Sequence, residues 1–215
     1  MMETDWSVAA GADDPVIEAR WSDASSGLSW VDLRVDAKTQ SARIAALPEA
    51  AASPAMAKAL SLLNAPHGLL MTTKCDRWQM SEEERAELAD ALDEPVAGFG
   101  CGSYIDVLMA HAVPMSDFLM HEEWARTAAR RCAAIPIDNA RVELVVRPAH
   151  NDAVWGYGLT MYCYAGGANV SGAEAAWGRA IEQTVPVLIA TAESMLASVD
   201  EISRDEIPGK ETGGA

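Results

Sequence analysis

Cys75 lies in the stretch "LLMTTKCDRWQ", where its type and its neighbours could support nucleophilic chemistry. A cysteine is reactive when nearby positive charges stabilise its thiolate, and Lys74 and Arg77 both lie close to it in the sequence. Neighbouring side chains of a strand point to opposite faces, however, so Lys74 would project away from Cys75. The same alternation would place Cys75 beside Leu69 and Met71. We therefore predict a structural thiol rather than a nucleophile.

The four histidines, at positions 67, 111, 121 and 150, do not form a metal-binding pattern. The sequence contains no Cys-x-x-Cys pair and no His-x-x-x-His pair. The motif "HEEW" starts at His121 but has Ala125 where a zinc-binding helix would need its second histidine. His121 instead shares a helical stripe with Phe118 and Cys132, which predicts a histidine in or beside the core. We expect neither a metal site nor a cofactor.

The glycine-rich segment "GFGCGS" (98–103) resembles a phosphate-binding loop in composition only. A dinucleotide-binding loop follows a strand and opens a helix, whereas this segment precedes a predicted strand. It also lacks the Lys-Ser/Thr pair of a P-loop. We predict a mobile turn between a helix and a strand.

Possible acid and base residues follow three predicted strands. Segments 69–77, 104–110 and 141–147 are separated by predicted helices, and such crossovers usually make the strands parallel. Their carboxyl ends would then share one edge of the sheet, where open α/β sheets often bind ligands. The side chains gathered there could perform acid–base catalysis: Asp76, His111, His150 and Asp152. The alternative is that these loops are polar only because they are in contact with water.

A second candidate site is a sheet face rich in aromatic and basic residues. Alternation along the predicted strands places six side chains on one face, where they could bind a ligand or a partner: Trp30, Arg34, Arg141, Arg147, Tyr162 and Tyr164. The arginines could clamp a carboxylate through paired hydrogen bonds. Trp, Tyr and Arg are also enriched at protein–protein contacts, so a partner or a second copy of the chain could bind there. Cross-strand ion pairs on a solvated face would explain the arginines without any ligand.

The predicted elements follow the order ββ-α-α-β-α-β-α-β-β-α. Capping patterns mark several helix starts, such as Ser81 followed by Glu84. Hairpins mixed with crossover helices predict an α+β fold, with a single mixed or antiparallel sheet of about six strands and helices packed mainly on one face. We expect a disordered arm over residues 1–14, one domain over 15–200 and a disordered acidic tail over 201–215.

The chain has 215 residues and a formal net charge of −16, which limits its partners. Such a surface repels phosphate groups, so we expect it to bind neither nucleic acid nor an anionic membrane. The first residues lack the basic and apolar regions of a signal peptide, and no apolar run is long enough to span a membrane. The four scattered cysteines do not suggest a disulfide scaffold, so we predict a reducing, cytoplasmic location.

Two kinds of function are compatible with these patterns. The first is a non-enzymatic interaction module that binds a protein, or itself, through the Trp/Tyr/Arg sheet face. The second is a small-molecule-binding domain or an enzyme with the His/Asp site at the strand ends. The lack of a catalytic motif and the seven tryptophans, against two phenylalanines, favour the first.

Overall fold

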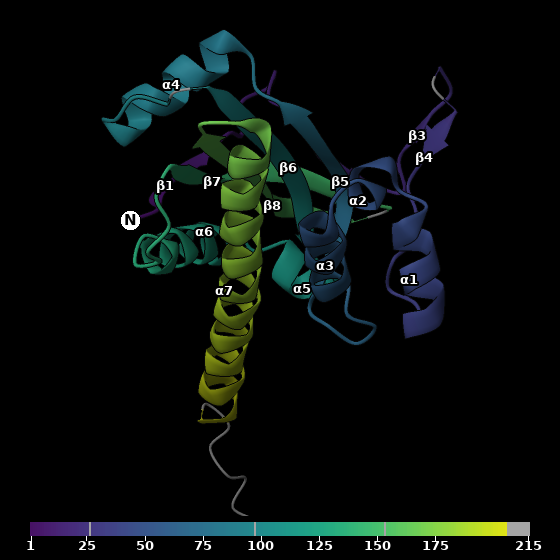
Figure 1. Ribbon diagram of the computed structural model, residues 1–215. Coiled ribbons are helices and arrows are strands. Elements are labelled where there is room, and N and C mark those ends of the chain that lie inside the picture. Colours follow the sequence, from purple (N-terminus) through teal and green to yellow (C-terminus); the bar gives the residue numbers. More distant parts are fainter. Residues whose placement is uncertain (26, 97, 153, 206–215) are drawn as a thin grey trace, which may run out of the picture.

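A six-stranded sheet runs through the middle of the molecule (Figure 1). The computed structural model describes residues 1–205 apart from residues 26, 97 and 153. Five strands lie side by side in the order β1-β7-β8-β6-β5, and β2 pairs with a further part of β7. Their bounds are Glu3–Val8 (β1), Ile17–Ala19 (β2), Leu70–Gln79 (β5), Phe99–Met109 (β6), Ala140–Asn151 (β7) and Val154–Gly167 (β8). The predicted α+β fold with a single mixed sheet is confirmed.

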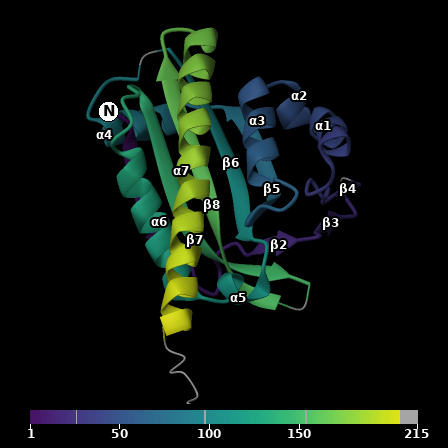
Figure 2. The same ribbon diagram turned by 90° about the horizontal axis from the view of Figure 1, so that it is seen from below.

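Three helices cover one face of this sheet. They are α3 (Pro54–Leu63), α6 (Phe118–Cys132) and α7 (Val170–Asp205), and all three lie in front of the strands when the molecule is seen from below (Figure 2). Their apolar stripes bury the facing side chains of the strands, as a helix layer on a sheet must. The prediction that helices pack mainly on one face is therefore confirmed.

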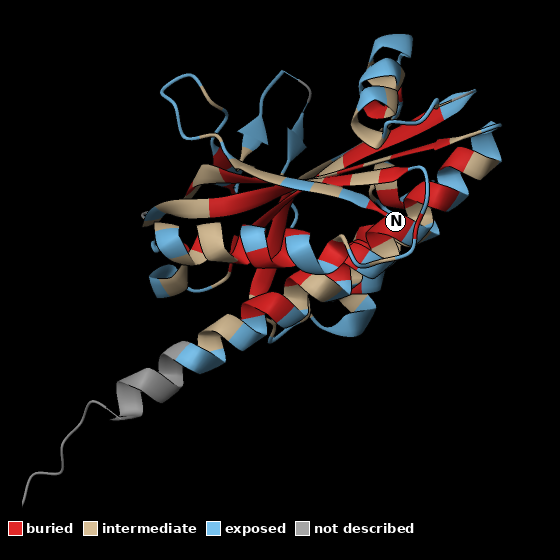
Figure 3. Cartoon of the chain, turned by 90° about the vertical axis from the view of Figure 1, so that its left-hand side faces the viewer, coloured by how far each residue is buried: buried red, intermediate tan, exposed pale blue. Residues whose placement is uncertain are grey.

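Two fully buried tryptophans join these helices to each other and to the sheet. Trp124 of α6 donates its Nε1–H to Leu188 O of α7, and Trp177 of α7 donates its own to Ser103 Oγ of β6, both at 2.9 Å. Because both indole N–H groups have acceptors, the rings can lie in the core without losing a hydrogen bond. Figure 3 shows the buried residues gathered where the helices meet the strands.

Smaller elements surround this framework. The helices are α1 (Ala37–Ala45), α2 (Pro48–Ala51), α4 (Glu82–Leu92) and α5 (Ala112–Met115), and two-residue strands β3 (Ser22–Asp23) and β4 (Leu28–Ser29) form a separate hairpin. The alternation of apolar and polar residues in "LSWVDLRV" predicts a strand over 28–35, but the structure has a strand only over Leu28–Ser29, so this prediction is wrong beyond Ser29. Its tryptophan and arginine turn instead toward the edge of β5, as described below.

The N-terminal residues form part of the main sheet. β1 is parallel to β7, with Trp6 opposite Leu144. Thr4 Oγ1 donates to Ala129 O of α6 at 3.0 Å, and Trp6 packs against the core. The expectation of a disordered arm over residues 1–14 is therefore wrong for residues 3–8, because a partner strand distant in sequence satisfies their backbone.

The C-terminal helix α7 is continuous from Val170 to Asp205. The disordered tail that we expected over 201–215 therefore starts within a helix. Residues 206–215 of that tail lie outside the described residues.

The directions of the strands differ from those expected. β5 and β6 are antiparallel, with Asp76 opposite Tyr104, because α4 lies near the end of the sheet where β5 finishes and β6 begins, and does not carry the chain back across it. β6 and β7 do run in the same direction, as expected. However, they are not neighbours, since β8 lies between them and is antiparallel to both.

Candidate functional site

The sheet face opposite α6 and α7 carries a cluster of four aromatic side chains, which we call the aromatic floor: Trp78, Tyr104, Tyr162 and Tyr164. Ser103 contacts α7, so its neighbour Tyr104 projects from the other face. The ring centroids are separated by 6.5 Å (Trp78–Tyr104), 6.3 Å (Trp78–Tyr164), 6.2 Å (Tyr104–Tyr162) and 6.1 Å (Tyr162–Tyr164). All four side chains are half-buried. A contiguous, partly exposed aromatic surface can supply the anchors of a recognition site.

Glycines of β6 make room for this floor. A Cβ atom on Gly102 would lie 2.7 Å from Trp78 Cε2, and one on Gly100 would lie 2.7 Å from Met80 Sδ. The missing side chains therefore let the Trp78 indole lie across β6 and reach Tyr164. The expected mobile turn over 98–103 is wrong from residue 99 onward, since those residues belong to β6.

Helix α4 closes one end of the floor. Glu84 accepts a hydrogen bond from Trp78 Nε1 at 2.8 Å through one carboxylate oxygen and from Ser81 N at 2.7 Å through the other. Ser81 Oγ accepts from Glu84 N, so the predicted capping box is present. The hydrogen bond from the Ser81 backbone is the main cause that keeps the pKa of Glu84 below its usual value, and the Trp78 indole contributes. One residue thus both caps α4 and orients the largest ring of the floor.

Residues 15–21 close the other end. Ile17 is buried, and its Cδ1 lies 3.1 Å from the position that a Cβ on Gly158 of β8 would take. Trp21 Nε1 donates to Thr73 O at 3.0 Å. The register of β5 shifts between Thr72 and Cys75, so this strand contains a β-bulge beside Trp21.

A cavity of about 200 Å³, which we call the Asp106 cavity, lies between residues 15–17 and the floor. Its polar lining consists of Lys74, Tyr104, Asp106, Arg147, Thr160 and Tyr162. Asp106 is only 8% exposed, and its Oδ1 accepts from Thr160 Oγ1 at 2.6 Å. Burial raises the pKa of Asp106, against the opposing effects of Thr160 and of the two cationic side chains.

Four of the six residues expected on the binding face lie on it: Arg141, Arg147, Tyr162 and Tyr164. Arg141 is opposite Tyr164 on β8. Its Nη2 lies 3.9 Å from a carboxylate oxygen of Asp5 on β1 and 3.9 Å from one of Glu143 on β7, so this face also has a cross-strand ion pair and a pair within one strand. Arg147 Nη2 donates to Tyr162 OH at 3.3 Å.

The other two residues lie elsewhere. Trp30 Nε1 donates to Thr72 O at 3.2 Å, and Arg34 Nη2 donates to Gly68 O at 3.1 Å. Both side chains therefore hydrogen-bond to backbone carbonyls at or just before the start of β5. Their assignment to the face is wrong because residues 30–35 do not form a strand of the main sheet. Conversely, sequence reasoning left Trp78 and Tyr104 out of the candidate site. The glycines at alternate positions of β6 were the available signal, because they mark a close approach.

The four proposed acid–base residues do not form a common site in the described structure. Asp76 is exposed and lies opposite Tyr104, well inside the sheet, whereas His111 precedes α5 at the far end of β6. The His150 ring contacts the Trp155 ring at an interplanar angle of 37°, with centroids 4.6 Å apart, and Asp152 pairs with Arg20 at 2.8 Å. Within the described part of the chain, no hydrogen bond, ion pair or ring contact joins any two of the four.

The environments of Cys75 and His121 agree with structural roles. Burial, assisted by the charges of Glu49 and Asp76, raises the pKa of Cys75 to about 12, which keeps its thiol protonated at neutral pH. His121 is fully buried, its Nδ1 lies 2.7 Å from Asp117 O, and burial lowers its pKa. In the described residues, no group of three or more His, Cys, Asp or Glu side chains could hold a metal ion.

The fold and the floor define the class: an α+β protein whose helices pack mainly on one face of the sheet and whose other face carries a cluster of aromatic side chains. No protein-family model, curated protein or solved structure matches the chain. Among the described helices, none combines the length and the apolar character needed to cross a membrane.

Proposed function

We propose that this protein is a non-enzymatic interaction module that binds a segment of a partner protein on the aromatic floor. The observation that carries the proposal is the contiguous set of half-buried rings on a face that α6 and α7 leave open. Large rings lose little conformational entropy on binding and dominate the energetics of many interfaces. The walls formed by α4 and residues 15–21 would limit the occupant to one segment of chain.

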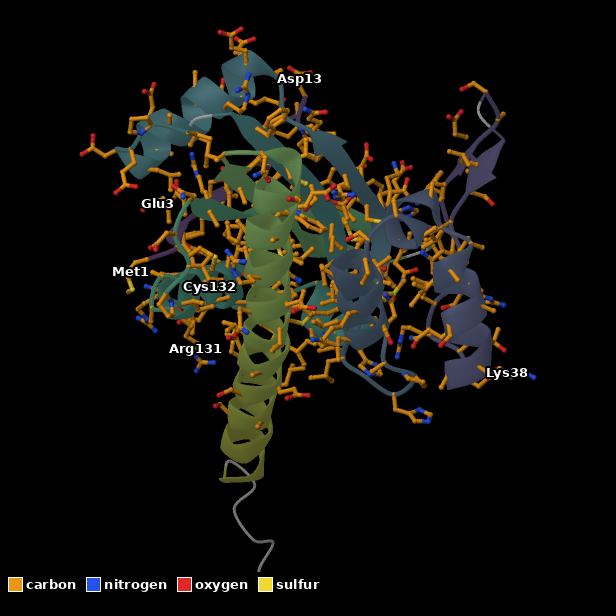
Figure 4. The ribbon with its side chains drawn as sticks, in the orientation of Figure 1. Met1, Glu3, Asp13, Lys38, Arg131 and Cys132 are labelled. Carbon is orange, nitrogen blue, oxygen red and sulfur yellow. The ribbon has the colours of Figure 1, made fainter. Side chains whose placement is uncertain are left out.

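The charges around the floor favour a basic partner. α4 carries many carboxylates and one arginine, in the sequence "EEERAELADAL", and its red-tipped side chains spread outward in Figure 4. The chain as a whole has a net charge of −16, so a second copy would meet strong repulsion when it approached the same face. A basic segment would instead be attracted to it, and apolar side chains of that segment would pack on the rings.

The acid–base enzyme remains an alternative proposal with less support. It needs His111 and His150 to act with an aspartate, yet Asp152 is paired with Arg20 and the His150 ring packs against Trp155. We also propose a cytoplasmic location. The four cysteines are all free, which suits a reducing compartment.

Selection of peptides from a displayed random library, with the purified full chain as target, tests the proposed function. We expect the selected peptides to have a net positive charge and apolar residues. The change Tyr164→Ser should weaken their binding at least about tenfold, as truncation of an interface hot spot does. The matched control is Trp155→Ser, which removes an exposed ring of the same strand outside the floor and should leave the affinity unchanged.

Fluorescence anisotropy of the labelled peptides gives these affinities, and circular dichroism confirms that both variants fold. Binding should also weaken as the salt concentration rises, because the attraction is partly electrostatic. Acidic or uncharged selected peptides, or equal losses in the two variants, would refute the proposal.

A further inference from the structure

We infer that the Asp106 cavity binds a carboxylate group that carries an apolar chain or residue. The inference goes beyond the proposed function, because it holds whether or not a protein segment covers the rest of the aromatic floor. It rests on the charges of the cavity, on the buried aspartate in its lining and on a second cavity beside it whose lining is largely apolar.

Two cationic side chains line the cavity and have no ion-pair partner in the described part of the chain. Lys74 and Arg147 both favour the charged form of Asp106, so both act on it electrostatically. Yet neither has a carboxylate oxygen within 4.0 Å among the residues that the structure describes. Arg147 uses one N–H for Tyr162 OH, which fixes the guanidinium and leaves other donors available. Lys74 Nζ lies 5.2 Å from the centroid of the Trp21 ring, which holds its charge beside the cavity.

The charge of the cavity matches a monoanion. Lys74 and Arg147 supply two positive charges and ionised Asp106 supplies one negative charge, so one anionic group would make the site neutral. A phosphate dianion would instead leave the site with an excess of negative charge beside the carboxylate of Asp106, which the bond from Thr160 holds in place. A carboxylate could instead accept hydrogen bonds from both cationic groups.

A second cavity, of about 310 Å³, lies beside the first and shares Lys74 and Tyr104 with it. Its apolar lining includes Leu28, Val31, Leu33, Leu47, Pro48 and Leu60. Because Lys74 and Tyr104 line both cavities, an apolar chain attached to the bound carboxylate could extend past the tyrosine ring into the second cavity. Burial of that chain would add hydrophobic stabilisation to the ionic contact.

Titration of the ¹⁵N-labelled full chain with hexanoate, followed by amide NMR shifts, tests the inference. We expect saturable shifts at Lys74, Asp106 and Thr160, and no such shifts with the neutral analogue hexanamide. The change Arg147→Gln should weaken hexanoate binding at least about tenfold, since it removes a charge-assisted contact. The matched control is Arg141→Gln, which changes the same residue type on the same face of β7 outside the cavity.

A second variant, Lys74→Met, should weaken binding similarly and leaves the bond between Arg147 and Tyr162 intact. Equal binding of hexanoate and hexanamide, or equal effects of Arg147→Gln and Arg141→Gln, would overturn the inference. Tyr164→Ser, which removes a ring of the floor that does not line the cavity, should leave hexanoate binding unchanged. Failure of the carboxylate site can therefore be told apart from failure of the proposed partner site.

The source of the carboxylate is resolved by a pair of peptides. Ala-Ala-Ala-Leu with a free C-terminus presents a carboxylate next to an apolar side chain, and its C-terminal amide does not. Binding of the free acid but not the amide would identify the end of a protein chain as a ligand. Binding of hexanoate alone would identify a small free acid, and binding of neither acid would refute the site.

Discussion

Adding a single methyl group at Gly102 would disturb the packing of the aromatic floor. In a Gly102→Ala variant, the added Cβ would lie 2.7 Å from Trp78 Cε2, so the indole must shift or the strands must separate. We expect a loss of about 1–3 kcal/mol in the free energy of unfolding, the usual cost of overpacking. Urea denaturation measures it.

A comparison glycine, Gly178, should give a change of the opposite sign in the free energy of unfolding. At Gly178 of α7 a Cβ would meet Ala55 Cβ at 3.5 Å, an ordinary contact. Gly178→Ala should therefore stabilise the protein by up to about 1 kcal/mol through helix propensity. The same loss in both variants would contradict the account of Gly102.

His121 should make the stability depend on pH. Burial lowers the pKa of His121 in the folded protein from its ordinary value of 6.5, so below that value the unfolded chain binds a proton that the buried ring does not. The contribution is present above about pH 6.5 and is lost as the pH falls toward the lowered folded pKa. Urea denaturation between pH 5 and 8 should show this slope in the wild type, by these linkage rules.

His121→Leu should remove that part of the slope even if it changes the absolute stability. His67→Gln, at an exposed position, should retain it. An unchanged slope in His121→Leu would mean that other groups cause the pH dependence.

Among the elements, β1 should contribute directly to stability. Trp6 belongs to the edge strand β1 and packs, partly buried, against the core. Trp6→Ala should therefore lower the free energy of unfolding by about 2 kcal/mol, less than the loss of a fully buried tryptophan would. Val8→Ala is the control, because Val8 is 42% exposed and should be nearly neutral. Thermal denaturation compares the two. If Trp6→Ala were also neutral, β1 would be only loosely attached.

Strong local signals made most elements predictable from the sequence. The capping box of Ser81 and Glu84 marks α4, and the clean alternation of residues 141–147 marks β7. Strand pairing was less predictable, because it depends on contacts that are distant in sequence. β1 has no clear period of its own and owes its conformation to β7, while the bulge after Thr72 reverses the faces of β5.

The candidate site was predicted in part for the same reasons. Alternation along β7 and β8 correctly grouped Arg141, Arg147, Tyr162 and Tyr164 on one face. An alternating pattern in a short segment such as 28–35 does not show whether the segment joins a sheet. Trp30 and Arg34 were therefore assigned to the wrong place. The prediction of an acid–base site required β5 and β6 to be parallel. The two strands are antiparallel, so their carboxyl ends lie at opposite edges of the sheet.

At the scale of the whole molecule, the net charge of −16 should make stability depend on salt. Repulsion among carboxylates destabilises a compact state, and salt screens it over about 10 Å at 0.1 M. Raising the salt concentration from about 0.01 M to about 0.1 M should therefore raise Tm, as measured by calorimetry.

The acidic α4 offers a test of that cause. Replacing Glu82, Glu83 and Glu87 by glutamine should reduce the response of Tm to salt, and the exposed positions should tolerate the change. A response as large as that of the wild type would place the repulsion elsewhere on the surface.

The two indole hydrogen bonds at the start of β5 also bear on how the protein avoids aggregation. β5 is the last strand of its sheet, and the unpaired backbone of such a strand can template the addition of another chain. Here Thr72 N donates to Asn64 Oδ1, while the carbonyls of Thr72 and Thr73 accept from Trp30 and Trp21. Because side chains already satisfy these groups, an incoming strand cannot extend the sheet at this point. The tryptophans thus protect this part of the β5 edge from the strand addition that begins fibril-like stacking.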